Sequence, residues 1–286
     1  MFKEIKKNIT DKNESQFDMI KKLELDRAAH EELIEYCNSR DIRFLSTAFD
    51  HDSVDLLAEL DIPLYKIPSG EITNLPYLRH IGSMGKPIIL STGMSTMDEV
   101  RDALNILIKS GAEKDQITIL HCNTEYPTPM EDVNLKAMLT IKDELGVNIG
   151  YSDHTLGIEI PIAAVAMGAT VIEKHFTLSR DEGGVDSAFS IEPDELKALV
   201  VESKRAWQSL GHIQYGPTEK EKASLAFRRS LYIAEDIQKG TTLTAKNLRA
   251  IRPGLGLPPK YYELLLGKPV NQDIKKGTPM SWDLIG

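Results

Sequence analysis

The chain has 286 residues, enough for one large domain and a small one, and its 41% hydrophobic and 27% charged residues are typical of a globular protein. A formal charge of −9 argues against a nucleic-acid-binding protein, whose surface would be basic, although a local cluster of cations can still bind small anions. The two cysteines, a start without an apolar core and apolar runs too short for a bilayer predict a cytoplasmic protein that binds no membrane.

Short apolar segments alternate with helical patterns along the first two thirds of the chain. Residues 1–14 are polar and predict a loop, and helical spacing follows over 26–40. Strands are predicted at 42–49, 64–67, 87–90 and 117–122 and within 149–155 and 169–178, with helices at 53–60, 95–109, 160–167 and 193–210. This alternation predicts parallel βα units, an α/β fold, and at this length a TIM-type (β/α)8 barrel rather than an open sheet.

Two consecutive predicted strands each deliver one histidine. Ser152 and His154 share one face of the first strand, and Glu173 and His175 share one face of the second, because strand side chains alternate. Both histidines fall near the carboxyl ends of their strands, where barrel enzymes place their chemistry. Either one alone is better explained as a hydrogen-bonded strand end. The pair at matching points favours a site for Mn²⁺, Mg²⁺ or another first-row metal.

Every predicted strand ends in a polar cluster. The clusters are Ser46-Thr47, Lys66 to Glu71, Ser91-Thr92-Gly93, Asn123 to Tyr126, Ser152 to His154 and Glu173 to His175. Small hydroxyl residues beside glycine let backbone N–H groups approach phosphate or carboxylate oxygens, and Lys66 supplies a cation. One such cluster is ordinary turn chemistry. Six on the same rim predict an anion-binding site.

The remaining chain predicts a second domain. A barrel domain over 1–212 is followed by a polar linker over 213–223 and a small domain over 224–286. In the small domain the segment 236–244 recurs as 273–281, and each copy carries a Lys-Gly turn. Two copies are too few for a solenoid, so the repeat predicts a pseudo-symmetric, β-rich module.

Two charged residues outside the predicted strands are further candidates. Asp186 ends an acidic loop, where its carboxylate could bind a sugar hydroxyl or simply face solvent. Arg252 lies before Pro253 and is equally well explained as a surface arginine next to a turn.

Five motifs, in order, resemble the N-acetylneuraminate (sialic acid) synthase family: 66–71, 90–94, 121–127, 150–155 and 173–176. The C-terminal repeat resembles the antifreeze-like, or SAF, domain of that family, so the resemblance covers nearly the whole chain. Family chains begin with two further strands, which carry a catalytic glutamate and a Lys-x-Gln phosphoenolpyruvate motif. Residues 1–14 resemble the stretch after those strands, which implies a barrel truncated by about two of eight βα units.

The resemblance implies an enzyme that condenses phosphoenolpyruvate with an N-acetylmannosamine-type aldehyde sugar and releases phosphate. It implies Mn²⁺ or Mg²⁺ on His154 and His175. Phosphoenolpyruvate would contact Thr47, Lys66, Ser69, Ser91 and Ser152, and the sugar would contact Tyr126, Asp186 and Arg252, the last from the other subunit of a domain-exchanged homodimer. Some members carry an asparagine where this chain has Thr124, so Thr124 and its neighbour Asn123 are both substrate-binding candidates. Glu71 or Asp153 could assist proton transfer, and the sequence does not decide between them.

Three functions remain open. The first is a nonulosonic acid synthase, acting on N-acetylmannosamine or on the modified sugars that lead to legionaminic or pseudaminic acid. The second is a catalytically inactive, truncated homologue that acts as a binding or scaffold protein. The third is another metal-dependent barrel lyase or aldolase, which leaves the C-terminal repeat unexplained. The truncation predicts an open sheet edge at 42–49, so the chain alone is expected to be poorly stable or to oligomerise, with little synthase activity.

Overall fold

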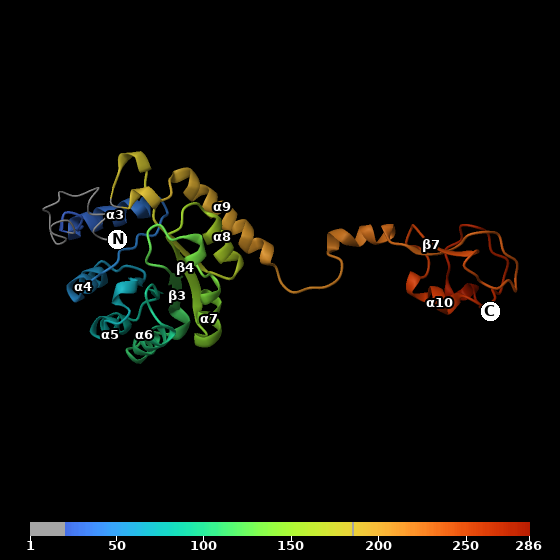
Figure 1. Cartoon of the computed structure of the whole chain (residues 1–286), viewed down its shortest axis with the longest axis horizontal. Helices are drawn as coiled ribbons and strands as arrows, with labels where there is room; N and C mark the ends of the chain where they lie inside the picture. Colours follow the sequence, from blue (N-terminus) through green and yellow to red (C-terminus); the bar gives the residue numbers. More distant parts are fainter. Residues whose placement is uncertain (1–20, 185) are drawn as a thin grey trace. The chain divides into compact units, whose positions relative to one another are not determined.

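The computed structural model describes residues 21–184 and 186–286. The expectation of a loop over 1–14 lies outside these residues. The chain divides into two compact units, with the division between Gly211 and His212 (Figure 1). Within the described residues, no helix is long and apolar enough to cross a membrane.

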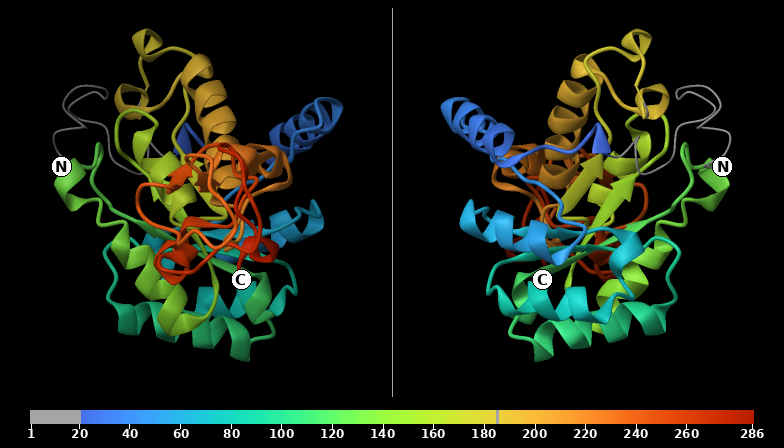
Figure 2. Two further views of the ribbon diagram at one scale, coloured as in Figure 1. Left: turned by 90° about the vertical axis from the view of Figure 1, so that its right-hand side faces the viewer. Right: turned by 90° about the vertical axis from the view of Figure 1, so that its left-hand side faces the viewer.

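The described part of the first unit is built on five parallel strands. They are β1 (Tyr65–Ile67), β2 (Ile88–Ser91), β3 (Ile117–Cys122), β4 (Asn148–Asp153) and β5 (Val171–Lys174), and each pairs with the next along the chain. The helices are α3 (Arg27–Ser39), α4 (His51–Glu59), α5 (Leu75–Ser83), α6 (Met97–Lys109), α7 (Lys136–Leu145), α8 (Glu159–Ala166) and α9 (Pro193–Leu210). The sheet is a curled half-barrel with helices around its outer side (Figure 2), which confirms the predicted βα-barrel class.

The strands form because their apolar residues are buried on the sheet. Ile67, Leu90 and Ile119 are fully buried, one on each of three neighbouring strands. A continuous apolar pattern of this kind is expected for a parallel sheet that helices cover. Helix α6 begins at a capping box, in which Thr96 and Glu99 each bond the other's backbone N–H group.

The strand predicted at 42–49 is wrong. In the described chain, no backbone hydrogen bond joins this segment to β1, and the sheet has five strands rather than six. Its apolar side chains do not alternate between core and solvent, since Ile42 and Phe49 are both more than half exposed. Ala48 alone is buried, and its carbonyl accepts a hydrogen bond from the Tyr77 hydroxyl. Strand propensity depends on a paired neighbour, and among the described residues this segment has none.

The segment predicted as a linker is partly structured. A 3-10 helix occupies Glu219–Phe227, so only the residues before it are irregular. The helix begins at Thr218, whose hydroxyl accepts a hydrogen bond from the backbone N–H of Glu221, while the Glu221 side chain accepts one from the Thr218 backbone. This capping box lies within a stretch whose charged composition had favoured a linker.

The second unit contains an antiparallel pair, β6 (Ser230–Ile233) with β7 (Leu248–Ile251), and the short helix α10 (Tyr262–Leu265). Its own apolar core includes Leu231, Leu248 and Leu265. These three buried residues come from β6, β7 and α10, so the second unit has an apolar core of its own.

The two copies of the repeat lie against each other in this unit. Ile237 and Ile274 form an antiparallel bridge and exchange backbone hydrogen bonds of 2.9 and 2.8 Å. The Asp236 carboxylate accepts a bond from the backbone N–H of Lys276, and Asp273 accepts the corresponding bond from Lys239. Each copy therefore caps the Lys-Gly turn of the other, which gives the predicted pseudo-symmetry a specific physical form.

Candidate active site

His154 and His175 lie side by side at the carboxyl ends of β4 and β5. Their ring centroids are 5.3 Å apart, with the ring planes inclined at 61°. The Nδ1 atom of His154 lies 2.7 Å from the Asn123 carbonyl oxygen, and that of His175 lies 3.5 Å from a carboxylate oxygen of Asp186. Because a carbonyl oxygen only accepts, His154 carries its proton on Nδ1 and leaves the Nε2 lone pair available.

This geometry fits a divalent metal. Burial lowers the pKa of His154, which favours the neutral imidazole that a metal requires. Metal-binding histidines usually donate their other ring N–H to a carbonyl or carboxylate, as Asn123 and Asp186 allow here. The described residues contain no group of three or more His, Cys, Asp or Glu side chains arranged to hold an ion. Two imidazoles would therefore leave most coordination positions open to substrate and water.

Aromatic rings form one wall beside the histidines. The Tyr126 ring lies 4.2 Å from that of His154 and 5.9 Å from that of His175, measured between centroids. Phe189 packs against Tyr126 and His175, at 5.5 and 5.0 Å. Burial raises the pKa of Tyr126 to about 12, so its hydroxyl stays protonated at neutral pH and can donate a hydrogen bond.

A cation and a carboxylate meet on the concave side of the sheet. The Nζ atom of Lys66 lies 3.1 Å from Oε2 of Glu173, and the Ser152 hydroxyl donates to the other oxygen of the same carboxylate at 2.8 Å. The Lys66 side chain is only 13% exposed. A largely buried cation beside a hydroxyl group is suited to binding an anionic group.

Polar atoms surround Gly93, in the loop after β2. Its N–H group donates to the Ser69 hydroxyl at 2.8 Å, and a Cβ at this position would lie 2.9 Å from that oxygen, 3.1 Å from Cys122 Sγ and 3.2 Å from Thr124 Oγ1. Any larger residue at position 93 would therefore clash with these neighbouring side chains. The nearby Ser91, at the end of β2, has a buried hydroxyl without a hydrogen-bond partner among the described residues. An unsatisfied buried hydroxyl is typical of a site that binds a ligand.

Other candidates have structural partners or lie elsewhere. The Asn123 side chain donates to the Asp132 carbonyl, so this residue positions His154 through its own backbone. The Glu71 carboxylate accepts a hydrogen bond from the Asn74 side chain at 2.7 Å, and in the described chain it makes no hydrogen bond or ion pair with the paired histidines. Thr47 lies half-buried in the coil that follows α3, and in the described chain no hydrogen bond joins its hydroxyl to the site.

Arg252 belongs to the second unit. It follows β7, is exposed, and among the described residues has no hydrogen bond or ion pair to its guanidinium. Asp153, the alternative to Glu71 for proton transfer, is fully buried and pairs with Lys174 at 2.5 Å. An ion pair closed to solvent is poorly suited to exchange protons with a substrate.

Sequence reasoning includes Glu173 and Gly93 in the polar strand ends without giving either a role of its own, and it misses Phe189. Glu173 was placed on the same strand face as His175, and that parity could have identified it. The sequence predicts only that Gly93 lets backbone N–H groups approach an anion, whereas in the structure three polar side chains also pack around it. Phe189 lies in the short 3-10 segment Ser187–Phe189, where periodicity gives no signal.

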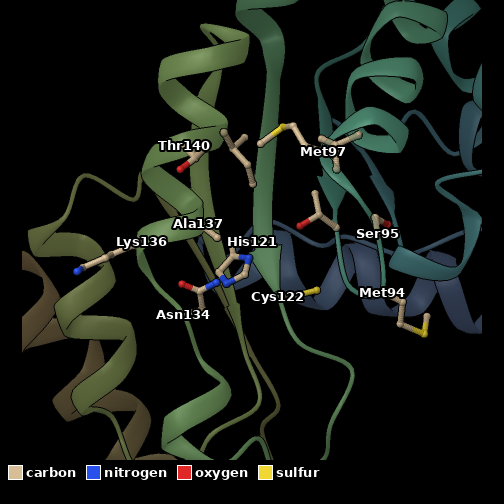
Figure 3. A pocket seen from close by; sticks show the side chains of 12 residues that line it. Met94, Ser95, Met97, His121, Cys122, Asn134, Lys136, Ala137 and Thr140 are labelled. Carbon is tan, nitrogen blue, oxygen red and sulfur yellow. The ribbon is translucent and has the colours of Figure 1, made fainter.

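A cavity of about 510 Å³ lies outside this cluster, between α6 and α7 (Figure 3). Its lining includes Thr92, His121, Asn134 and Lys136, and it shares Cys122 with the cluster around Gly93. His121 donates a hydrogen bond from Nε2 to the Val133 carbonyl at 2.9 Å, so Nε2 carries the proton, because a carbonyl oxygen only accepts.

The fold and these side chains define a parallel βα-barrel protein with paired histidines and a hydroxyl-lined, cationic site at the carboxyl ends of its strands. The chain belongs to the NeuB family, which matches residues 2–215, and residues 228–286 match the SAF domain.

Relatives and solved structures agree with this assignment. The chain is 48% identical to the N,N'-diacetyllegionaminic acid synthase of Campylobacter jejuni, over 93% of this chain and 80% of the relative. It is 41% identical to the enzyme of the same name from Legionella pneumophila, over 99% of this chain and 80% of that one. A crystal structure of the N-acetylneuraminic acid synthetase of Leptospira borgpetersenii, bound to citrate, superposes with a TM-score of 0.70 at 35% identity, over 78% and 77% of the two chains.

Proposed function

We propose that this chain is a nonulosonic acid synthase that joins phosphoenolpyruvate to a 2-acetamido aldehyde sugar and releases phosphate. The observation that supports it most is the placement of Lys66, Glu173 and Ser152 on the same rim as the paired histidines. Such a rim can hold an anion and a carbonyl compound together. Relatives with 48% and 41% identity are named N,N'-diacetyllegionaminic acid synthases, which favours a sugar with two acetamido groups over N-acetylmannosamine.

His154 and His175 would hold Mn²⁺ or Mg²⁺ through their Nε2 atoms, and the ion would supply Lewis acidity for the aldehyde oxygen. Lys66 would bind an anionic group of phosphoenolpyruvate, with the hydroxyls of Ser69, Ser91 and Ser152 as further hydrogen-bonding groups. This role is electrostatic and positional, because a cation and hydroxyl donors stabilise negative charge without forming a covalent bond to the substrate.

Tyr126 would donate its hydroxyl hydrogen to the sugar, while Phe189 packs against the same ring and limits access of water. Carbon 3 of phosphoenolpyruvate forms the new bond to the aldehyde carbon, water adds to carbon 2, and phosphate leaves. One water is consumed for each phosphate released. Asp186, which faces His175, would help to orient the ring and the sugar.

Phosphate release tests this proposal. The chain, with the two upstream strands of the family restored, is purified and mixed with phosphoenolpyruvate and Mn²⁺, and with either N-acetylmannosamine or a 2,4-diacetamido sugar, and phosphate and 2-keto acid are measured together. We expect equal amounts of both products, metal dependence, and a faster reaction with the diacetamido sugar. The His154→Ala variant is the control for contaminating phosphatase.

Two outcomes would contradict the proposal. Phosphate release without keto acid formation would indicate hydrolysis alone. Binding of phosphoenolpyruvate without turnover of any acetamido sugar would favour the alternative of an inactive binding protein, which the resemblance to a family with two further strands motivates.

The proposal also includes a homodimer in which Arg252 of one subunit contacts the sugar bound by the other. The resemblance supports this, and so does the exposed guanidinium, which has no hydrogen bond or ion pair within the described chain and whose paired N–H donors could hold acetamido or hydroxyl oxygens. Inactive Arg252→Ala and His175→Ala protomers would be mixed and allowed to exchange. Activity should return, because one hybrid site has both residues. Heterodimers that form and remain inactive would contradict the assignment in trans.

A further inference from the structure

A buried ion pair lies directly behind the paired histidines. Asp153 and Lys174 are register partners on β4 and β5, and Lys174 Nζ lies 2.5 Å from Asp153 Oδ2. Their side chains are 0% and 3% exposed. Because side chains alternate along a strand, the two point to the opposite face from Ser152 and Glu173, whose contact lies on the concave side.

The ion pair is also bonded to Thr155, so it connects the residues on either side of His154. Lys174 Nζ also donates to the Thr155 carbonyl at 2.7 Å, and the Thr155 N–H donates to Asp153 Oδ1 at 3.0 Å. These three bonds close a small ring through Asp153, Thr155 and Lys174. His154 is the residue between two of them, and His175 directly follows the third. The ring therefore fixes the backbone on which both imidazoles are carried.

Stability alone is a poor explanation for this arrangement. Removing two charges from water costs roughly several kcal/mol, and their mutual attraction offsets this cost only when the geometry is good. Apolar replacements of buried ion pairs are often neutral or stabilising. A buried charge pair at this point is better explained by what it orients. Backbone carbonyls and N–H groups on the loop after β4 obtain directed partners that apolar side chains could not provide.

We propose that Asp153 and Lys174 are positioning residues that set the relative placement of His154 and His175 for a divalent metal. The inference rests on the metal site in the proposed function. The pair does not touch the metal or the substrate; it acts through the loop from Asp153 to Thr155. Metal affinity, rather than folding, is therefore the property that depends on the ionic nature of the pair.

Direct Mn²⁺ binding tests the inference without turnover. Free Mn²⁺ is measured by electron paramagnetic resonance during titration of the full chain, and unfolding by urea is measured on the same samples. Lys174→Met leaves Asp153 charged and unpaired, so we expect loss of both stability and affinity. The informative variant is the double change Asp153→Leu with Lys174→Met, which removes both charges. We expect it to be more stable than Lys174→Met, because no buried charge is left unpaired, while its Mn²⁺ affinity stays about 10-fold or more below that of the original chain.

A matched control separates positioning from general loosening of the core. Ile119→Val removes one methyl group from a fully buried position on β3, away from the histidine loops. Ile119→Val should lower the free energy of unfolding in urea, yet it should leave the Mn²⁺ dissociation constant within about two-fold of that of the original chain. Weakening as large as in the double variant would show that affinity follows stability, and the inference would be wrong.

Failure of the metal site and failure of the inference give different results. If the original chain binds no Mn²⁺, or if His154→Ala binds it equally well, the metal assignment itself is wrong. If His154→Ala abolishes binding but the folded double variant keeps full affinity, the histidine site stands and the positioning role of the ion pair is wrong. A lower affinity in the double variant with unchanged control affinity supports both.

Discussion

Lys66 Nζ lies 3.1 Å from Glu173 Oε2, although the two residues belong to β1 and β5, the outermost strands of the sheet. Four ladders separate these strands along the sheet, so the side chains meet only because the sheet is strongly curled. The contact places opposite charges at the proposed anion site before any substrate binds. Glu173 therefore competes with an incoming anion for the Lys66 ammonium group.

This competition predicts opposite effects for changes to the two residues. Glu173→Gln keeps an acceptor for the Ser152 hydroxyl and removes a negative charge, so phosphoenolpyruvate should bind several-fold more tightly. Lys66→Met should weaken binding by about tenfold or more, because an anion then lacks its cation. Isothermal titration with phosphoenolpyruvate measures both.

Lys86→Met is the control, since Lys86 pairs with Asp61 at the surface and is not in the site. It should leave phosphoenolpyruvate binding unchanged. Weaker binding in Glu173→Gln would mean that the carboxylate holds the site together rather than competing with the ligand.

The paired histidines predict strong non-additivity in metal binding. His154→Ala and His175→Ala should each reduce Mn²⁺ affinity to nearly that of the double variant, because one remaining imidazole cannot hold the ion alone. Calorimetric titration with Mn²⁺ gives the three values. Independent, additive losses would indicate two separate weak sites instead of one shared ion.

Tyr126 predicts a separation between the two substrates. Tyr126→Phe keeps the ring that packs against His154 and Phe189 but removes the hydroxyl donor. The KM for the sugar should rise while the KM for phosphoenolpyruvate stays nearly constant. Since the pKa of Tyr126 is raised to about 12, the difference between the two proteins should not change across neutral pH. A larger effect on phosphoenolpyruvate would place the hydroxyl at the anion instead.

The sequence predicted the elements whose pattern is set by local burial. Strand β3 has the bounds Ile117–Cys122 and helix α9 the bounds Pro193–Leu210, both as expected, because an apolar run and a proline at the first turn are local signals. The strand at 42–49 could not be decided locally. Its apolar and β-branched residues favour a strand only when a neighbouring strand supplies backbone hydrogen bonds.

The candidate site follows the same division. His154 and His175 could be brought together from matching strand ends, because parallel strands carry their carboxyl ends to one edge. The contact between Lys66 and Glu173 could not, since it depends on the curl of the sheet rather than on strand order. The ion pair of Asp153 with Lys174 was equally hidden, because register between strands has no mark in a single sequence.

The repeat in the second unit predicts equal losses from equivalent changes. Asp236→Ala removes the acceptor for the Lys276 N–H group, and Asp273→Ala removes the one for Lys239. Both should lower the unfolding temperature of the second unit by similar amounts, with a somewhat larger effect at Asp236, which also bonds the Lys275 side chain. Differential scanning calorimetry of the full chain measures the shift in unfolding temperature, from the transition in which residues 212–286 unfold. Loss from only one variant would contradict the pseudo-symmetry.

Burial of His121 predicts that acid destabilises the first unit. Burial lowers the pKa of this imidazole below its ordinary value of 6.5, and the hydrogen bond to the Val133 carbonyl opposes this lowering only in part. Below 6.5 the unfolded chain takes up a proton that the folded chain resists, so the unfolded state gains stability. The contribution of His121 is therefore complete above that pH and is lost as the pH falls toward the lower pKa of the folded state.

Urea unfolding followed by far-ultraviolet circular dichroism, which reports mainly the helices of the first unit, measures this dependence between about pH 7.5 and about pH 5.5. His121→Gln can keep a donor toward Val133 but cannot take up the proton, so its stability should fall less with acid than that of the original chain. The slope should not vanish, because burial also lowers the pKa of His154. His212→Gln, in the second unit, serves as the control and should leave the slope unchanged. An equal acid dependence in His121→Gln and the original chain would mean that His121 is protonated equally well in the folded and unfolded states.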